Sequence, residues 1–176
     1  MLAYLFLPRH GSPPFQTIVY FPGGAALYDD KLELSTAESS DTMDFLLKSG
    51  RALMFPIYKG TYERRDGLIS GRTPRAAFRD HVIAWSKDLG RSLDYLETRK
   101  DIDSTKVGYF GASMGGAEGS VMAAVESRIR VMILSSGGFQ ARYDLPEVDP
   151  FNFAPHVKIP VLMINGRYDQ DFPLES

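Results

Sequence analysis

One stretch decides the fold, and it reads Val107-Gly-Tyr-Phe-Gly111-Ala-Ser113-Met-Gly115-Gly116. It places the pattern Gly-x-Ser-x-Gly between an apolar run that predicts a strand, Lys106 to Phe110, and a run rich in Ala and Gly that predicts a helix, Met114 to Val125. A turn this tight requires small residues at positions 111 and 115, and it pushes the Ser113 hydroxyl out at the carboxyl end of the strand. A serine presented in this way is a candidate nucleophile, whereas the same pattern in an ordinary Gly-rich turn would carry no chemistry.

Backbone N–H groups at two places are candidate donors to an oxyanion. The helix after Ser113 points its N-terminus at the serine, so the N–H of Met114 can donate to a developing negative charge. The second place is Tyr20-Phe21-Pro22-Gly23-Gly24-Ala25, where a predicted strand ends in two glycines that let the chain run close to a reacting carbonyl. The N–H of Gly24 and that of Ala25 both fit, and a plain turn made by the glycines is the alternative interpretation.

Two carboxylates follow the last predicted strand, which runs from Pro160 to Asn165, and they lie in the turn Gly166-Arg-Tyr-Asp169-Gln-Asp171-Phe-Pro173. An acid at this point comes after the serine in the chain order Ser, Asp, His that accompanies such an elbow. Its role would be to accept the Nδ1–H of an imidazole and to fix its tautomer. Asp169 and Asp171 are both candidates on this ground, and a solvated turn is the alternative.

The three histidines are each in the wrong place to supply that imidazole. His10 lies between the first two predicted strands, His81 lies within a long predicted helix, and His156 precedes the strand that begins at Pro160. His156 would have to cross the thickness of the sheet to reach Ser113. We therefore expect ordinary surface or helix-face histidines and no base for Ser113 among them.

Strands and helices alternate along the rest of the chain. Thr73-Pro74 predicts the start of the longest helix, with Thr73 as N-cap and Pro74 at the first helical position. The apolar positions of this helix recur every three or four residues and are Phe78, Val82, Trp85, Leu89, Leu93 and Leu96. Another helix is predicted to begin after Asp41 as N-cap and to stop at Gly50, and further strands are predicted at Tyr4 to Leu7, Thr17 to Phe21, Ala52 to Tyr58 and Val131 to Leu134.

This alternation predicts an α/β fold, a doubly wound and mostly parallel sheet with helices on both faces. The first two strands are separated by the Pro-, Gly- and Ser-rich residues 8–14, which predict a hairpin or a pair of adjacent strands. The region from Gly137 to Val157 carries three prolines and scattered aromatics. It predicts a loop over one edge of the sheet, which either borders the substrate entrance or simply connects two elements.

The composition narrows the class of protein. The chain has 176 residues, 44% of them hydrophobic, which fits one domain over residues 1–176 with a single core. Lys and Arg number 20 against 22 Asp and Glu, so there is no basic block for nucleic acid. There is no Cys for a disulfide or a thiolate metal site, and no apolar run approaches the ~20 residues of a membrane span. We expect neither nucleic acid nor a membrane as a partner, and the cytoplasm is the default location.

Together these segments resemble the α/β-hydrolase superfamily, most closely the branch of dienelactone hydrolases, acetyl xylan esterases and prolyl oligopeptidase catalytic domains. The features that carry the resemblance cover nearly all of the chain and are Tyr20 to Gly24, Ala52 to Tyr58 with Lys59-Gly60-Thr61, the long helix ending in Asp101-Ile102-Asp103, the elbow at Ser113 and the turn at Asp169. In that family a turn of the form G-x-x-D-x-x-[VF]-P commonly carries the triad acid. Gly166, Asp169, Phe172 and Pro173 match it, which favours Asp169 over Asp171.

The resemblance implies a serine esterase or peptidase that works by two-step acyl transfer with no metal or organic cofactor. The reaction would take an ester or amide carbonyl, and small carboxylic esters are favoured over peptides, because these residues include no propeller or other gating domain that selects oligopeptides. The family places its histidine after one further helix and strand, so the chain is expected to be incomplete at its C-terminus and nearly inert alone. A non-catalytic pseudo-hydrolase or binding module that keeps the fold is the alternative.

An incomplete sheet would also affect how the protein associates. Without the last helix and strand, the strand Val161 to Ile164 would present an open edge or an uncovered face. We therefore expect lower stability than that of a whole domain, and self-association through this edge.

Overall fold

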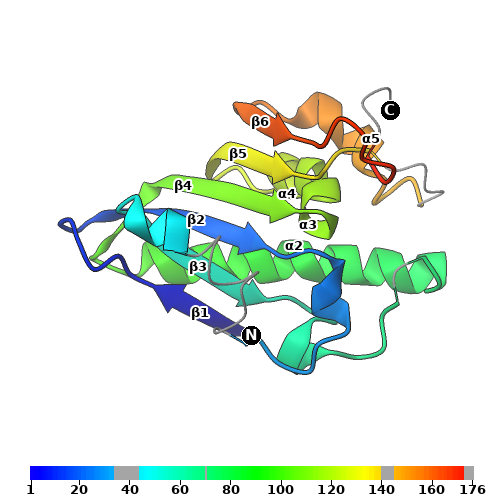
Figure 1. The fold of residues 1–176 in the computed structure, drawn as a ribbon, viewed down its shortest axis with the longest axis horizontal. Coiled ribbons are helices and arrows are strands. Elements are labelled where there is room, and N and C mark those ends of the chain that lie inside the picture. Colours follow the sequence, from blue (N-terminus) through cyan, green and yellow to red (C-terminus); the bar gives the residue numbers. More distant parts are fainter. Residues whose placement is uncertain (34–43, 70, 140–144, 173–176) are drawn as a thin grey trace.

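The computed structural model describes residues 1–33, 44–69, 71–139 and 145–172, so the predicted N-cap Asp41 and the motif residue Pro173 lie outside it. Within the described residues, one six-stranded sheet has the spatial order β1-β3-β2-β4-β5-β6 (Figure 1). Its strands are β1 (Leu2–Phe6), β2 (Phe15–Phe21), β3 (Ala52–Ile57), β4 (Ile102–Ala112), β5 (Ile129–Ser135) and β6 (Val161–Ile164). β1 runs antiparallel to β3 and every other neighbouring pair is parallel, which confirms the predicted mostly parallel sheet.

Helices cover both faces of the sheet, as the alternation of elements predicts. They are α2 (Arg75–Glu97), α3 (Met114–Ala117), α4 (Gly119–Val125) and α5 (Pro150–Phe153), with the 3₁₀ turns η1 (Gly24–Leu27), η2 (Tyr62–Arg64) and η3 (Ala154–His156). Residues 44–48 are also helical. One core lies between the sheet and α2 and α4, and a second lies where Leu46 packs on β2 and β3 from the opposite face. None of the helices in the described ranges is long and apolar enough to cross a membrane.

The longest helix, α2, packs as its apolar period predicts, because Val82, Trp85, Leu89, Leu93 and Leu96 are buried and Phe78 packs against the same core. Its N-cap differs from the prediction. Pro74 is the N-cap, and Thr73 lies one residue further out. The Thr73 hydroxyl accepts from the Ile69 N–H (2.9 Å) and donates to the Ile69 carbonyl (3.0 Å), so it is engaged there and does not cap α2.

The predicted pairing of the first two strands, as a hairpin or as neighbours, is wrong. β3 lies between β1 and β2. Every residue of β3 is buried, which requires a strand on each side, and β1 supplies the second one. Residues 8–14 therefore cross the end of β3 to reach β2 instead of forming a tight turn.

Two further segments differ from the prediction in detail. The predicted helix Met114 to Val125 is divided at Glu118 into α3 and α4. The second part begins at Gly119, which lies so close to β5 that a Cβ there would be 2.5 Å from Leu134 Cδ2. The region Gly137 to Val157, predicted to be an irregular loop, contains α5 and η3 among its described residues.

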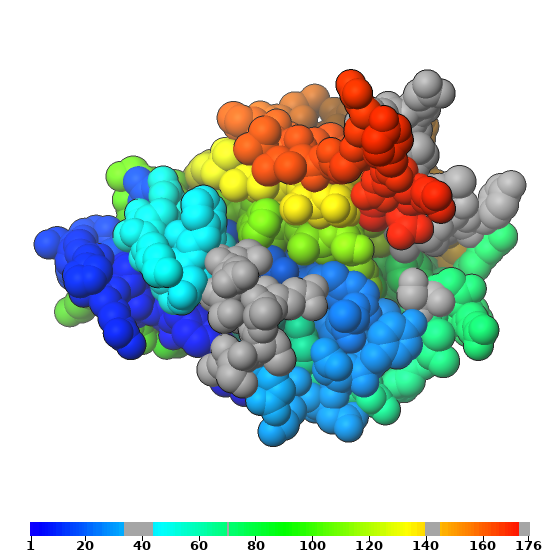
Figure 2. All heavy atoms as spheres, in the orientation of Figure 1, coloured from blue at the N-terminus to red at the C-terminus, as the bar shows by residue number. Residues whose placement is uncertain are grey.

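β6 forms one edge of the sheet, and its residues Val161, Leu162, Met163 and Ile164 are 42%, 54%, 51% and 54% exposed. Figure 2 shows β5, in yellow, and β6, in orange, at the surface of the face that residues 44–48, in cyan, cover only in part. The predicted exposure of this strand is therefore observed.

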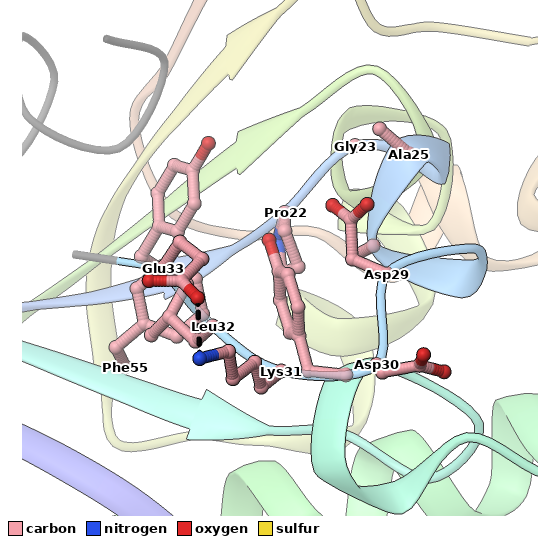
Figure 3. A pocket seen from close by; sticks show the side chains of 12 residues that line it. Pro22, Gly23, Ala25, Asp29, Asp30, Lys31, Leu32, Glu33 and Phe55 are labelled. Carbon is pink, nitrogen blue, oxygen red and sulfur yellow. Dashed lines mark ion pairs between the residues drawn. The ribbon is translucent and has the colours of Figure 1, made fainter. Parts of the chain in front are cut away.

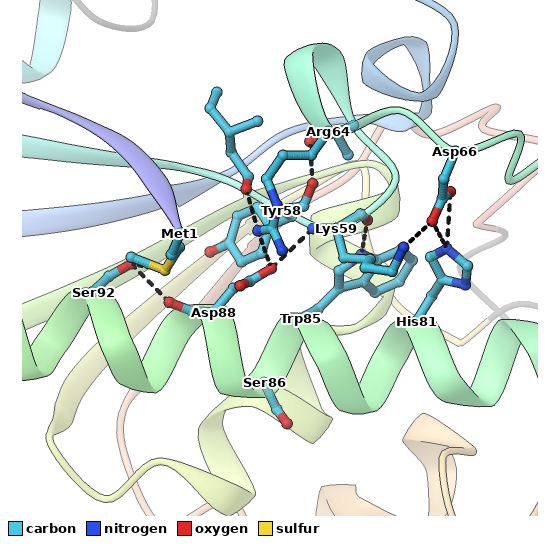
Figure 4. A network of polar contacts seen from close by, with 12 residues as sticks. Met1, Tyr58, Lys59, Arg64, Asp66, His81, Trp85, Ser86, Asp88 and Ser92 are labelled. Carbon is cyan, nitrogen blue, oxygen red and sulfur yellow. Dashed lines mark hydrogen bonds and ion pairs between the residues drawn. The ribbon is translucent and has the colours of Figure 1, made fainter.

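Polar contacts fasten the loop after β3 to α2 (Figure 4). The nearly buried Asp88 carboxylate accepts from the Arg64 guanidinium (2.6 Å) and from the Lys59 N–H (2.9 Å). Asp66 lies against the Lys59 ammonium and the His81 ring. Burial opposes the ionisation of Asp66, but the hydrogen bonds from Lys59 and His81 outweigh it and keep the pKa of this carboxyl below its usual value. These contacts fix the loop at the carboxyl end of β3, beside the end of β2.

Candidate active site

Ser113 lies at the junction of β4 and α3, at the carboxyl edge of the sheet (Figure 1). Its backbone has φ 48 and ψ −105, a conformation that residues other than glycine rarely adopt. Strain of this kind persists only where the surroundings enforce it, and it occurs often at functional sites. The side chain is exposed, and its hydroxyl has no hydrogen-bond partner in the part of the chain that the structure describes.

Gly111 and Gly115 leave no room for a side chain. A Cβ on Gly111 would lie 2.2 Å from the Gly115 carbonyl oxygen, and a Cβ on Gly115 would lie 2.3 Å from the Phe21 carbonyl oxygen. Real Cβ atoms essentially never come within 3.0 Å of other atoms, and both neighbours here are backbone. The packing of α3 against β2 and β4 therefore requires glycine at both positions, as the sequence predicts.

Backbone hydrogen bonds tie the elbow to the strands on either side. The Ser113 N–H donates to the Ser135 carbonyl of β5 (2.8 Å), and the Gly115 N–H donates to the Pro22 carbonyl after β2 (3.1 Å). Between them, the N–H of Met114 has no acceptor among the described residues, as expected for the first position of a helix. It is therefore available to a ligand at the serine.

The loop after β2 lies against the elbow. Gly23 approaches Ser113 so closely that a Cβ on Gly23 would lie 3.4 Å from the Ser113 Cβ. η1 begins at Gly24, and the N–H groups of Gly24 and Ala25 have no acceptor among the described residues. Both candidate oxyanion segments, this loop and the N–H of Met114, therefore lie beside the serine.

A hollow of about 300 Å³ opens beside the same loop (Figure 3). Gly23 and Ala25 form part of its wall, and its described lining also includes the rings of Tyr20, Phe55 and Tyr62 and the charged side chains of Asp29, Asp30, Lys31 and Glu33. Lys31 and Glu33 form an ion pair (2.6 Å). Small-molecule sites begin at about this volume, so the hollow is large enough for one part of a small ester.

Asp169 lies in the turn after β6, where the backbone braces its carboxylate. Its Oδ1 accepts the N–H groups of Asp171 (3.0 Å) and Phe172 (3.0 Å), and its own N–H donates to the Gly166 carbonyl (3.1 Å). Phe172 is 2% exposed and anchors the turn. The Asp171 carboxylate is exposed and has no partner within the described ranges. Of the two candidate acids, Asp169 is the one held by hydrogen bonds, and its second oxygen has no donor among the described residues.

Ser113 and Asp169 lie at the same edge of the sheet. Ser113 follows β4 and Asp169 follows β6, which are the first and third of three neighbouring parallel strands. Neighbouring strands are about 4.8 Å apart, so the ends of β4 and β6 are separated by about 10 Å. Strand ends at this spacing leave room for one imidazole ring between the segments that follow them.

The fold has clear counterparts among solved structures, although no protein-family model and no curated protein matches the sequence. The chain is similar to a protein given the name dienelactone hydrolase from Klebsiella pneumoniae subsp. pneumoniae MGH 78578, with 16% identity, a TM-score of 0.73 and coverage of 98% of this chain and 70% of that one. It is also similar to a cold-adapted esterase from an Arctic intertidal metagenomic library (22% identity, TM-score 0.68, 99% and 70% covered) and to Est1E from Butyrivibrio proteoclasticus, solved with ferulic acid (16% identity, TM-score 0.64, 99% and 78% covered). The chain has an α/β-hydrolase fold.

In this α/β-hydrolase fold, the histidines lie away from the serine edge. β1 is antiparallel to its neighbour, so His10, between β1 and β2, lies at the amino edge of the parallel strands. His156 ends η3 shortly before β6 begins, and it lies at the amino edge as well. His81 lies on α2, where its Nε2 is 3.1 Å from both Asp66 oxygens and its Nδ1 is 2.8 Å from the Ala77 carbonyl. The described arrangement therefore supplies no imidazole between Ser113 and Asp169.

One polar side chain near the Asp169 turn was not predicted from the sequence as a functional residue. The side-chain amide of Asn165, directly after β6, accepts the Gly137 N–H and donates to the Gly137 carbonyl. The only signal in the sequence is a polar residue at the end of an apolar strand.

No group of three or more His, Asp or Glu side chains gathers as a metal site would require within residues 1–33, 44–69, 71–139 and 145–172.

Proposed function

We propose that this protein is a serine hydrolase that cleaves small carboxylic esters through an acyl-enzyme, with Ser113 as the nucleophile. The observation that carries the proposal is the strained backbone of Ser113 (φ 48) at the carboxyl edge of the sheet. Gly111 and Gly115 permit this tight turn, because there is no room for a Cβ at either position. Tyr62 and Ser136 also have a positive φ, so the conformation alone does not mark a functional residue. At Ser113 it occurs in a tight turn from a strand to a helix and leaves the hydroxyl exposed, which is the arrangement of a nucleophile elbow. Amides are a second substrate class that the same chemistry serves.

In the first step, Ser113 Oγ forms a bond to the carbonyl carbon, the hydroxyl proton passes to a base, and the carbonyl oxygen becomes an oxyanion. The N–H of Met114, together with that of Gly24 or Ala25, donates to this oxyanion. The carbon–oxygen bond to the alcohol then breaks, and the alcohol takes the proton from the base. Water attacks the acyl-enzyme in the same manner, which releases the acid and restores Ser113. These steps need no metal or organic cofactor.

The base in this scheme is a histidine that residues 1–176 do not supply. His10 and His156 lie at the opposite edge of the sheet, and both ring nitrogens of His81 are engaged elsewhere. Asp169, whose second carboxylate oxygen accepts no bond among the described residues, would accept the Nδ1–H of that imidazole and stabilise the imidazolium. The separation of about 10 Å between the ends of β4 and β6 accommodates the ring.

The hollow beside Gly23 and Ala25 is the proposed site for one side of the ester. It adjoins the oxyanion loop and measures about 300 Å³, which is at the small end of the range for ligand sites. Its aromatic rings would contact apolar parts of the substrate, and its charged side chains would face the solvent. This size is what favours small esters over oligopeptides.

Hydrolysis of p-nitrophenyl acetate by the complete gene product tests the proposal. Ser113→Ala should lower kcat by about 10⁶-fold, as loss of the nucleophile does in a related triad enzyme. The matched control is Ser86→Ala, since Ser86 lies partly buried on α2 and, among the described residues, its hydroxyl bonds only to the Ile83 carbonyl (2.9 Å). The control should change kcat by less than about twofold. A Ser113→Ala variant as active as the wild type would overturn the assignment.

Residues 1–176 alone should be nearly inert toward the same ester, because a serine hydroxyl is a poor nucleophile without a base. Free imidazole should raise the hydrolysis rate of residues 1–176 more than that of their Ser113→Ala variant. The variant serves as the control for hydrolysis by imidazole itself. If residues 1–176 and the complete gene product hydrolyse the ester at rates within about tenfold, the base must be His10, His81 or His156.

The position of the histidines also favours a second candidate, a non-catalytic protein that keeps the fold to bind a ligand. In that case the complete gene product would hydrolyse no ester, and Ser113 would react with no more probe than Ser86 does. A rate that depends on Ser113 excludes this candidate.

A further inference from the structure

A side-chain clamp joins the end of β6 to the segment that follows β5. The Asn165 Oδ1 accepts the Gly137 N–H (3.1 Å), and the Asn165 Nδ2 donates to the Gly137 carbonyl (2.8 Å). Just before this pair, the Ser136 N–H donates to the Ile164 carbonyl (2.8 Å). The amide of Asn165 therefore continues the pairing of β5 with β6 by one step beyond the backbone.

Gly137 is packed in turn against the helix that follows the serine. A Cβ on Gly137 would lie 2.7 Å from Gly116 Cα, and a Cβ on Gly116 would lie 2.8 Å from Gly137 Cα. The two backbones therefore touch with no side chain between them. Gly116 belongs to α3, which starts directly after Ser113, so a shift of Gly137 is transmitted to the elbow.

On its other side, Asn165 leads directly into the turn that contains Asp169. This turn is closed by the Asp169 N–H on the Gly166 carbonyl (3.1 Å) and by the two N–H groups that Asp169 Oδ1 accepts. At its far end the ring of Phe172 packs over Gly138, where a Cβ would be 3.8 Å from Phe172 Cδ1. The turn that contains Asp169, the acid turn, therefore contacts residues 137 and 138 at two points, through Asn165 and through Phe172.

We propose that Asn165 is a positioning residue for the ester hydrolysis proposed above. By holding Gly137 between α3 and the acid turn, it sets the distance between Ser113 and Asp169 and thus the orientation of the imidazole between them. The inference rests on the proposed function. A misplacement of 1 Å in a catalytic arrangement costs on the order of 10²-fold in rate, so loss of the clamp should be visible in turnover.

The test is steady-state ester hydrolysis by the complete gene product with Asn165→Ala. We expect kcat to fall by about 10- to 100-fold and KM to change by less than about twofold, because the hollow beside Gly23 is untouched. Asn165→Asp keeps the acceptor for the Gly137 N–H but sets a carboxylate oxygen against the Gly137 carbonyl, so its kcat should fall as well. Asn152→Ala is the matched control, since it removes one hydrogen bond from a side-chain amide to the Pro146 carbonyl (2.9 Å) on the surface and should leave kcat unchanged.

A double-mutant cycle with Asp169→Asn separates positioning from a general loss of structure. In the Asp169→Asn background, replacing Asn165 should lower kcat by less than about twofold further, because the clamp acts through that carboxylate. If Asn165→Ala does not fold, Asn165→Asp carries the same cycle. Equal losses in both backgrounds, or no loss in the single variants, would overturn the clamp. Either of these results leaves the nucleophile assignment standing, whereas an active Ser113→Ala variant removes both proposals.

Discussion

Replacing Gly115 by alanine would add one methyl group where α3 meets β2. The new Cβ would lie 2.3 Å from the Phe21 carbonyl oxygen and 2.7 Å from the Phe21 Cβ. Ordinary contacts begin near 3.4 Å, so α3 and β2 would have to separate by about 1 Å. Phe21 is fully buried and its strand is paired on both sides, so the displacement falls on α3.

Two terms set the size of the effect. Overpacking destabilises by about 1–3 kcal/mol, and contact with backbone atoms puts this case near the upper end. The displacement also breaks the hydrogen bond from the Gly115 N–H to the Pro22 carbonyl (3.1 Å), which contributes about 1 kcal/mol. We therefore expect Gly115→Ala to lower the free energy of unfolding by about 3–4 kcal/mol, a large part of the stability of a small domain.

Urea unfolding of residues 1–176, followed by far-ultraviolet circular dichroism, measures this loss. Gly90→Ala is the matched control, because Gly90 lies within α2 and a Cβ there would meet its nearest neighbour, Glu126 Oε2, at 3.6 Å. Alanine is the better helix former, so this variant should gain up to about 1 kcal/mol. Glycine to alanine should therefore lower the free energy of unfolding at position 115 and raise it at position 90. If Gly115→Ala is as stable as the wild type to within about 0.5 kcal/mol, the reasoning about the elbow is refuted.

Three further results are expected. In the complete gene product, Asp169→Asn should lower kcat by about 10⁴-fold and Asp171→Asn far less, and the reverse order would move the acid to Asp171. Burial opposes the ionisation of Asp66, but the hydrogen bonds from Lys59 and His81 lower its pKa in the folded protein. Its contribution to stability is therefore complete above the unfolded value of about 3.9 and is lost as the pH falls through the folded value. Asp66→Asn should therefore reduce the fall in unfolding free energy between about pH 5 and pH 3, and an unchanged fall would contradict the pKa shift. Residues 1–176 should self-associate through β6, where Leu162 is 54% exposed, and size-exclusion chromatography measures this. Leu162→Lys should reduce the self-association. A clean monomer of the wild type with a sharp thermal transition would count against the prediction.

The features that the sequence predicts well are those decided by near neighbours in the chain. The buried face of α2 follows from the spacing of Trp85, Leu89 and Leu93, because a helix brings residues three or four apart to one side. The elbow at Ser113 follows from its flanking glycines, because a turn between a strand and a helix leaves no room for a Cβ. In both cases the interacting groups are separated by a few residues only.

The features that the sequence does not reveal depend on contacts between distant residues. β3 is inserted between β1 and β2 because a fully buried strand needs two neighbours, and nothing near residues 8–14 signals that. Asn165 and Gly137 are 28 residues apart, and the sequence around the asparagine indicates only the end of an apolar strand. Thr73 has the right type and place for an N-cap, but its hydroxyl has a competing partner in Ile69.

Reaction with a fluorophosphonate probe, followed by peptide mapping in a mass spectrometer, tests most directly the claim that Ser113 is the nucleophile. In the complete gene product we predict a single adduct, on Ser113, and none in the Ser113→Ala variant. Labelling of that variant to the same extent as the wild type, or an adduct on another residue, would contradict the claim.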